Sequence, residues 1–251
     1  MMHKIWLMGG LRNQLFQINY GYKLKKRGFN VCFIDNLIKK SFITETLLSW
    51  TIHPCMLTDL VNIGMYTEKN IMPIFFSKID FLNQWSNYLD QDHIPENLPK
   101  NIFGYFQDES LQNDVFFKDR IQLSLYKSFN VCMPEIVVHL RFGDAPNFHQ
   151  NSEYYRKALK KVQGNSVCIC TDDQELARRF LKNNCINYYF SSDILKDDFK
   201  ILVNAKIVIV APSTFSWWAV KLSRVISEVY LSKKTYSILG SPSNSAKINI
   251  I

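Results

Sequence analysis

Short apolar runs alternate along the chain with longer polar stretches, and this pattern predicts an α/β protein built on parallel strands. Aliphatic side chains dominate five runs that are expected to be strands: residues 4–8, 31–34, 136–138, 167–170 and 206–211. Mixed polar and apolar stretches are expected to be helices: residues 13–26, 151–162 and 173–183, and those that begin near residues 197 and 213. The first strand, helix and second strand form a βαβ unit of the doubly wound kind.

The middle of the chain is less regular. Residues 39–98 show no clear periodicity, and no site is predicted there. Residues 101–107 are expected to form a short strand that runs into a loop, and residues 110–130 a helix. Pro134 then precedes the next strand and is taken as a domain junction. Two domains are therefore expected: 1–133 and 134–251.

The composition is that of a folded protein with a sizeable core, since 47% of its 251 residues are hydrophobic. No apolar run reaches the roughly 18 residues of a transmembrane helix, and no signal peptide is evident, so a cytoplasmic location is expected. Cysteines in the strand-like runs are expected to be buried, and no ligand spacing predicts a metal site. The net charge of +8 indicates an anionic partner such as nucleotide, nucleic acid or membrane headgroups.

The clearest candidate for chemistry is the polar end of the strand that begins at Ile136. His139, Arg141 and Asp144 emerge there within six positions. Ligands of open parallel sheets bind beyond the carboxyl ends of the strands. The planar, permanently charged guanidinium of Arg141 matches a phosphate or diphosphate, although a surface ion pair between Arg141 and Asp144 is an equal alternative.

Two acidic residues follow the next strand. Asp172 stands three positions before Glu175, a variant of the capping box, and this spacing predicts that Asp172 caps the helix that follows. Asp173 has no such structural explanation and is kept as a candidate site residue.

Hydroxyl groups gather where a later helix begins, at Ser213, Thr214 and Ser216. Together with the N–H groups of the first helical turn, they suit a phosphate. Alternatively, Ser213 or Thr214 only caps the helix, and the paired tryptophans that follow fill the core. The tryptophans are assigned to the core, whereas Ser216 is kept as a candidate phosphate ligand.

Five stretches, in order, resemble sequence blocks of the bacterial alpha-1,2-fucosyltransferases. They are Gly9-Gly10-Leu11-Arg12-Asn13-Gln14-Leu15-Phe16-Gln17, Gly104-Tyr105-Phe106-Gln107, Tyr154-Tyr155 after the arginine motif, Thr171-Asp172-Asp173, and Ser213-Thr214-Phe215-Ser216-Trp217-Trp218-Ala219. The resemblance implies a GT-B fold with two Rossmann-like domains facing across a cleft, the first on the acceptor side and the second on the donor side. It also implies metal-independent, inverting transfer of L-fucose from GDP-L-fucose to the 2-hydroxyl of a galactose-type acceptor, in O-antigen synthesis.

The resemblance assigns roles to individual residues. Arg141 would hold the diphosphate and stabilise the GDP leaving group, with His139 supporting its loop. Asp198 would bind guanine, and Asp173 would contact the nucleotide or support Arg141. Further roles fall at the two helix starts. Ser216 and Thr214 would bind the phosphate, Gly10 would contact the donor through its backbone, and Asn13 would lie near the sugar. Asp144 is the nearest candidate for the general base.

Two positions depart from the family pattern. Phe142 stands where the second arginine of H-x-R-R-x-D is usual, and Arg12 replaces a glycine of the first block. Arg12 would supply part of the missing charge, or the site would accept a related GDP-deoxyhexose such as GDP-L-colitose.

The partners implied are a GDP-sugar and an oligosaccharide linked to a lipid diphosphate, with peripheral contact to an anionic membrane. A non-catalytic nucleotide- or RNA-binding protein is the alternative from another class. Scattered rather than clustered basic residues argue against nucleic acid.

Overall fold

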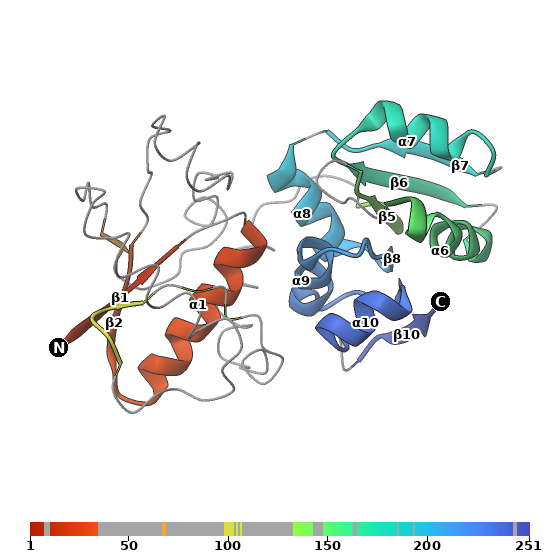
Figure 1. Cartoon of the computed structure of the whole chain (residues 1–251). Coiled ribbons are helices and arrows are strands. Elements are labelled where there is room, and N and C mark those ends of the chain that lie inside the picture. The colour runs from red at the N-terminus through yellow and green to blue at the C-terminus, as the bar shows by residue number, and fades with distance from the viewer. Residues whose placement is uncertain are drawn as a thin grey trace. The chain divides into compact units, whose positions relative to one another are not determined.

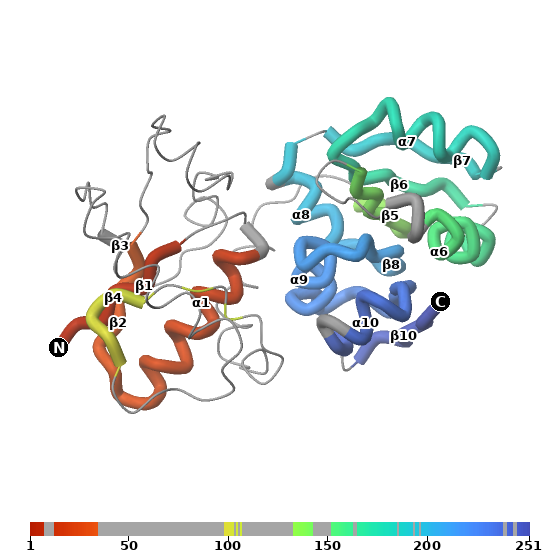
Figure 2. The backbone as a smooth tube through the Cα atoms, viewed as in Figure 1, coloured from red at the N-terminus to blue at the C-terminus, as the bar shows by residue number. Residues whose placement is uncertain are grey.

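The computed structural model describes most of the chain outside residues 35–132. The described residues are 1–7, 11–34, 67–68, 98–102, 104, 106, 133–142, 148–162, 165–184, 186–192, 194–242 and 245–251. The helix expected at residues 110–130 lies outside them. The chain divides into two compact units, Met1–Ser124 and Leu125–Ile251, each described by itself (Figures 1 and 2). No helix within the described ranges is long and apolar enough to span a membrane.

Unit 1 contains a parallel sheet with one described helix beside it. The elements are β1 (Met2–Trp6), α1 (Leu11–Lys26), β2 (Asn30–Ile34), β3 (Thr67–Glu68) and β4 (Asn101–Ile102). The strand order is β3-β2-β1-β4, and every described pair is parallel. The first strand therefore lies inside the sheet, with its sequence neighbour β2 on one side and the distant β4 on the other.

Helix α1 lies close against this sheet because it presents a glycine to it. A Cβ built on Gly21 would lie 2.5 Å from the ring of Phe33 and 2.9 Å from the side chain of Ile5. Both of those residues are fully buried. The helix ends before Gly28, whose φ of 89° suits a residue without a Cβ.

Unit 2 alternates strands and helices along its described length (Figure 1). Its elements are β5 (Ile136–Leu140), α6 (Phe148–Lys161), β6 (Ser166–Thr171), α7 (Gln174–Leu181), β7 (Asn187–Phe190), α8 (Leu195–Asn204), β8 (Ile207–Ile209), α9 (Thr214–Leu222), β9 (Glu228–Leu231), α10 (Lys233–Leu239) and β10 (Lys247–Ile250). The strand order is β10-β9-β8-β5-β6-β7, with all pairs parallel. From β5 the chain therefore builds the sheet in one direction, and from β8 in the other. This is the strand order of the doubly wound Rossmann fold.

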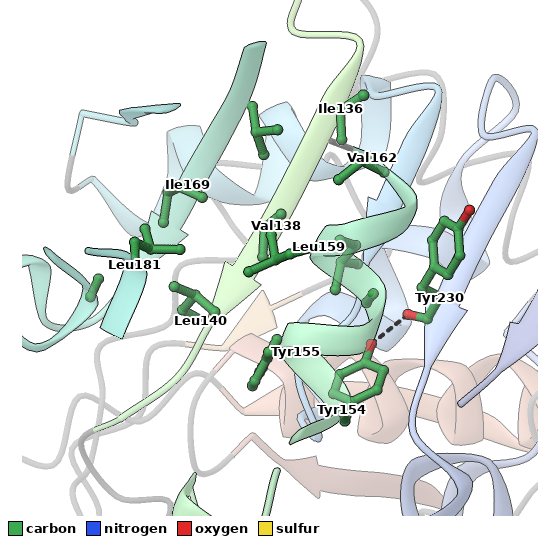
Figure 3. Packing of buried hydrophobic residues seen from close by; sticks show 14 residues of the cluster. Ile136, Val138, Leu140, Tyr154, Tyr155, Leu159, Val162, Ile169, Leu181 and Tyr230 are labelled. Atoms are coloured by element: carbon green, nitrogen blue, oxygen red, sulfur yellow. Dashed lines mark hydrogen bonds between the residues drawn. The ribbon is translucent and has the colours of Figure 1, made fainter. Parts of the chain in front are cut away.

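Helices cover both faces of the second sheet. Alternate β5 residues Val138 and Leu140 pack with Tyr155 and Leu159 of α6 in one cluster, which α7 joins (Figure 3). On the opposite face, His139 contacts Phe215 of α9, with ring centroids 5.4 Å apart. All five residues of β5 are buried, as expected for a central parallel strand.

Candidate active site

The sequence motifs of unit 2 lie at the point where the sheet changes direction. Strands β5 and β8 are neighbours in the sheet but are far apart in the chain. Their connections leave toward opposite sides, so a crevice opens at their carboxyl ends. Arg141 follows β5, and Ser213 follows β8. This is where a doubly wound sheet binds its ligand.

A hydrogen bond joins the two loops at this point. Nη1 of Arg141 donates to Oγ of Ser213 over 2.9 Å, although the residues are 72 positions apart. Arg141 is half-buried. The guanidinium is therefore directed toward the start of α9, and not only toward solvent.

Ser213 also begins α9. Its side chain accepts a hydrogen bond from the N–H of Phe215, which makes it the N-cap of the helix. The next residue, Thr214, is partly exposed. The partial positive charge of a helix start and a fixed guanidinium thus lie together, and both favour an anion such as a diphosphate.

His139 lies beneath this arrangement as a neutral side chain. It is 7% exposed, and burial lowers its pKa to about 4, an effect that the nearby Asp172 carboxylate opposes. In the part of the chain that the structure describes, Nδ1 of His139 has no hydrogen-bond partner. A neutral imidazole adds no positive charge beside Arg141, and its ring packs against Phe215 of α9.

The two acidic residues after β6 exchange their predicted roles. Asp173, not Asp172, caps α7, because its Oδ1 accepts from the N–H of Leu176. Asp172 instead accepts a hydrogen bond of 2.8 Å from the backbone N–H of Phe142. The prediction that Asp172 caps the helix was therefore wrong. Its carboxylate holds the arginine loop instead.

Ser216 is covered in this structure, so its role as a phosphate ligand stays a prediction. It is fully buried, and its hydroxyl donates to the carbonyl of Ala211 over 3.4 Å. With Ser213 as the cap, Ser216 is the third helical residue and lies inside the fold. Ser213, which the sequence offered both as a phosphate ligand and as a cap, is the cap of the helix, is 4% exposed, and accepts from Arg141.

Asp198 is covered as well. It is 5% exposed on α8. The pKa of Cys170 is raised by its hydrogen bond with Cys168, by burial and by the Asp198 carboxylate, which places that carboxylate near β6. Contact between Asp198 and a guanine base stays a prediction, made for a side chain that is buried in this structure.

Phe142 takes no part in an anion site. Its side chain is partly buried against the cluster that α6 and α7 form on the sheet. The site therefore has one guanidinium from this loop, as the sequence indicated. Asp144, the candidate base, lies outside the described residues.

Unit 1 also brings two of the sequence blocks together. Nε2 of Gln17 on α1 donates to the carbonyl of Gly104 over 2.9 Å. The rings of Tyr20 and Phe106 stack with centroids 4.0 Å apart. Phe106 has a φ of 51°, which is uncommon for a residue other than glycine. The loop after β4 is thus fixed to the helix that follows β1, at the point where the first sheet changes direction.

The remaining candidates of unit 1 are only partly described. Asn13 lies in the first turn of α1 and is half-exposed. Arg12 is also in that turn, but its side chain is outside what the structure describes, and Gly10 lies outside entirely. Among the described residues no group of three or more His, Cys, Asp or Glu side chains could hold a metal ion.

Comparisons with known proteins agree with this architecture. The sequence model of glycosyl transferase family 11 matches residues 75–238. The O-antigen biosynthesis glycosyltransferase WbnK of Escherichia coli is 25% identical, with 92% of this chain and 93% of that protein covered. The solved structure of E. coli heptosyltransferase WaaC with ADP is similar with a TM-score of 0.53 and 10% identity, over 100% of this chain and 93% of that one.

The structural likeness confirms the expected fold class, an α/β fold of GT-B type. The family match includes the arginine loop, both acidic residues after β6 and the whole of α9. It confirms the resemblance that the sequence blocks indicated. Since the match covers more than half of the chain, this protein is a glycosyltransferase that belongs to glycosyl transferase family 11.

Proposed function

We propose that this protein transfers L-fucose from GDP-L-fucose to the 2-hydroxyl of a galactose-type acceptor during O-antigen synthesis. Family membership supports the glycosyl transfer, and the named function of the E. coli relative WbnK supports the O-antigen. The observation that carries the proposal is the contact of Arg141 with Ser213 at the switch point of unit 2. Unit 2 is accordingly the donor side, and unit 1 the acceptor side.

The proposed chemistry is an inverting displacement. The acceptor oxygen attacks C1 of fucose while the bond from C1 to the β-phosphate oxygen breaks, and the electron pair stays on GDP. The acceptor hydroxyl proton passes to a base, for which Asp144 is the candidate. Charge that develops on the leaving diphosphate is the main demand on the protein. Arg141 and the start of α9 supply positive potential there, so the proposed reaction needs no metal.

The sugar is the less constrained part of the donor. Because Phe142 stands where the family pattern has a second arginine, this stretch contributes one guanidinium, that of Arg141. A site with fewer fixed charges near the sugar is compatible with a related deoxyhexose, and GDP-L-colitose is the alternative donor. A transfer assay with both donors decides between them.

The first test is nucleotide binding, measured by thermal unfolding with GDP, UDP, ADP and CMP, each with and without EDTA. A ligand at about a hundred times its dissociation constant stabilises a protein by roughly 2.7 kcal/mol, a rise of several degrees in Tm. We expect a selective response to GDP that EDTA does not change. An equal response to all four nucleotides, or none, contradicts the proposed donor.

Variants of Arg141 make the test specific to the site. Arg141→Ala removes the charge, and Arg141→Lys keeps the charge but loses the fork that binds two phosphate oxygens. We expect the GDP response to vanish in the first and to weaken in the second. Arg156→Ala, an exposed arginine on α6, is the matched control and should respond as the wild type does.

The acceptor is proposed to be linked to a lipid diphosphate, which places the reaction at a membrane surface. The net charge of +8 supports peripheral attraction to anionic lipid. Sedimentation with vesicles containing phosphatidylglycerol, at low and high salt, tests this point. Salt-sensitive binding is expected, and no binding at low salt contradicts it.

A further inference from the structure

The paired tyrosines of α6 have no role in the function proposed so far. Tyr154 and Tyr155 are both buried, at 6% and 0% exposure. Burial raises the pKa of both hydroxyls well above its ordinary value, so both stay protonated and act as donors. Each donates to backbone carbonyls of the sheet.

The carbonyls that they hold lie at the ends of three strands. The hydroxyl of Tyr155 donates to the carbonyl of His139 on β5 over 3.1 Å. The hydroxyl of Tyr154 lies 2.8 Å from the carbonyl of Val210, just after β8, and 2.7 Å from that of Tyr230 on β9. Figure 3 shows Tyr154 directed to Tyr230. One hydroxyl hydrogen is thus shared between two neighbouring strand ends.

These positions are where the strands begin to separate. The last pair in the β5 and β8 register is Val138 with Ile209. His139 and Val210 are the next residues on the two strands, and their carbonyls are the ones that the tyrosines bind. The two hydroxyls therefore bind carbonyls just beyond the last pair of β5 and β8, at the point where the crevice opens.

The arginine contact lies a few residues beyond. Arg141 is two residues after His139, and Ser213 is three after Val210. Two adjacent side chains on one rigid helix thus fix the separation of the two strand ends that carry the anion site. Loss of a hydroxyl removes one hydrogen bond from these carbonyls, although the Tyr230 carbonyl also accepts from the N–H of Val210 over 2.9 Å.

We propose that Tyr154 and Tyr155 are positioning residues, which set the distance between the arginine loop and the start of α9. The proposal rests on the proposed function for its kinetic consequence. A displacement of well under 1 Å at Arg141 weakens the charge stabilisation of the leaving group more than it weakens ground-state binding.

The test uses Tyr154→Phe and Tyr155→Phe in the full chain, because phenylalanine keeps the packing and removes only the hydroxyl. We expect kcat with GDP-fucose to fall about tenfold in each variant, while KM changes less than about threefold. Tyr236→Phe on α10, where the tyrosine is 41% exposed, is the control and should keep wild-type kinetics.

Hydrogen exchange supplies a readout that does not depend on activity. We expect faster exchange confined to the peptides that cover residues 138–142 and 209–214, with the rest of the sheet unchanged. A lower Tm with unchanged kcat and no local increase in exchange overturns the proposal and leaves the hydroxyls a purely structural role. If the wild type does not use GDP-fucose, the proposed function fails, and the exchange pattern still decides the role of the tyrosines.

Discussion

Acid should destabilise this protein through one buried side chain, His139. Burial lowers its pKa from 6.5 to about 4 in the folded state. Between these values the unfolded chain binds a proton that the folded chain does not, so the free energy of unfolding falls as the pH falls. Above about pH 6.5, His139 does not lower the free energy of unfolding. Below it, the free energy of unfolding falls progressively toward pH 4.

The size of the effect follows from the two pKa values. At pH 5.0 protonation favours the unfolded state by a factor of about thirty, which is about 2 kcal/mol, whereas at pH 7.5 the effect is negligible. Two kilocalories are a large part of the 5–15 kcal/mol that is usual for a folded domain.

Urea unfolding of the wild type and of His139→Asn, at pH 7.5 and at pH 5.0, measures this contribution. Tryptophan fluorescence follows unfolding, and Trp217 and Trp218 of unit 2, both fully buried, contribute to the signal. Carboxylates titrate in both proteins and cancel in the comparison. We expect the wild type to lose about 2 kcal/mol more than the variant over this interval. Equal losses in the two proteins would refute the assignment of a buried, neutral histidine.

Three further substitutions test other parts of the structure. Gly21→Ala should destabilise unit 1 by about 1–2 kcal/mol in urea unfolding, because the added Cβ meets the buried ring of Phe33. This loss is expected although alanine has the higher helix propensity. A more stable variant would contradict the close packing. Asp172→Ala should lower kcat/KM about tenfold. Asp172→Asn should lower it much less, since the amide oxygen still accepts a hydrogen bond from the N–H of Phe142. Equal losses in the two variants would show that the charge of Asp172 matters instead. Ser213→Ala should lower the free energy of unfolding by about 1 kcal/mol, because the helix loses its cap, and should also weaken GDP binding in a titration. Ser213→Thr should keep both the stability and the binding. Unchanged binding in the alanine variant would exclude the serine from the site.

The elements that position the site could be predicted from the sequence because their signals are local. The run from Ile136 is short, apolar and rich in β-branched residues, which favours a buried strand, and the structure has β5 there. The paired tryptophans were correctly assigned to the core. Arg141 could be singled out because it directly follows this strand and so lies at its carboxyl end, and His139 because it is the polar side chain near the end of an otherwise apolar run.

The residues that were misplaced depend on a helix start that the sequence leaves ambiguous. Each residue turns an α-helix by about 100°, so moving the cap by one position changes which side chains lie on the buried face. Asp172 and Asp173 both satisfy the requirements of a cap, and the choice of the second freed the first for the arginine loop. The same ambiguity left Ser213 and Thr214 as alternative caps of α9, and the structure has Ser213 there.

Long-range pairing is the other part that the sequence could not supply. No local pattern indicates that Gln17 meets the carbonyl of Gly104, or that Tyr154 binds strand ends 56 and 76 residues away. These contacts follow from the strand order. The sequence blocks predicted which residues matter, but not which of them touch.

The strand order of unit 2 also bears on how the protein folds. Strands β5, β6 and β7 pair with sequence neighbours through short connections, whereas β5 meets β8 only after about seventy residues of intervening chain have been arranged. Contacts between distant segments form late because closing a long loop costs entropy that only later contacts offset. The contact between Arg141 and Ser213 spans this slow step. A chain that has folded only its first half thus has its arginine but not the contact with Ser213, and if nucleotide binds as proposed, it can stabilise unit 2 only once the two halves of the sheet have joined.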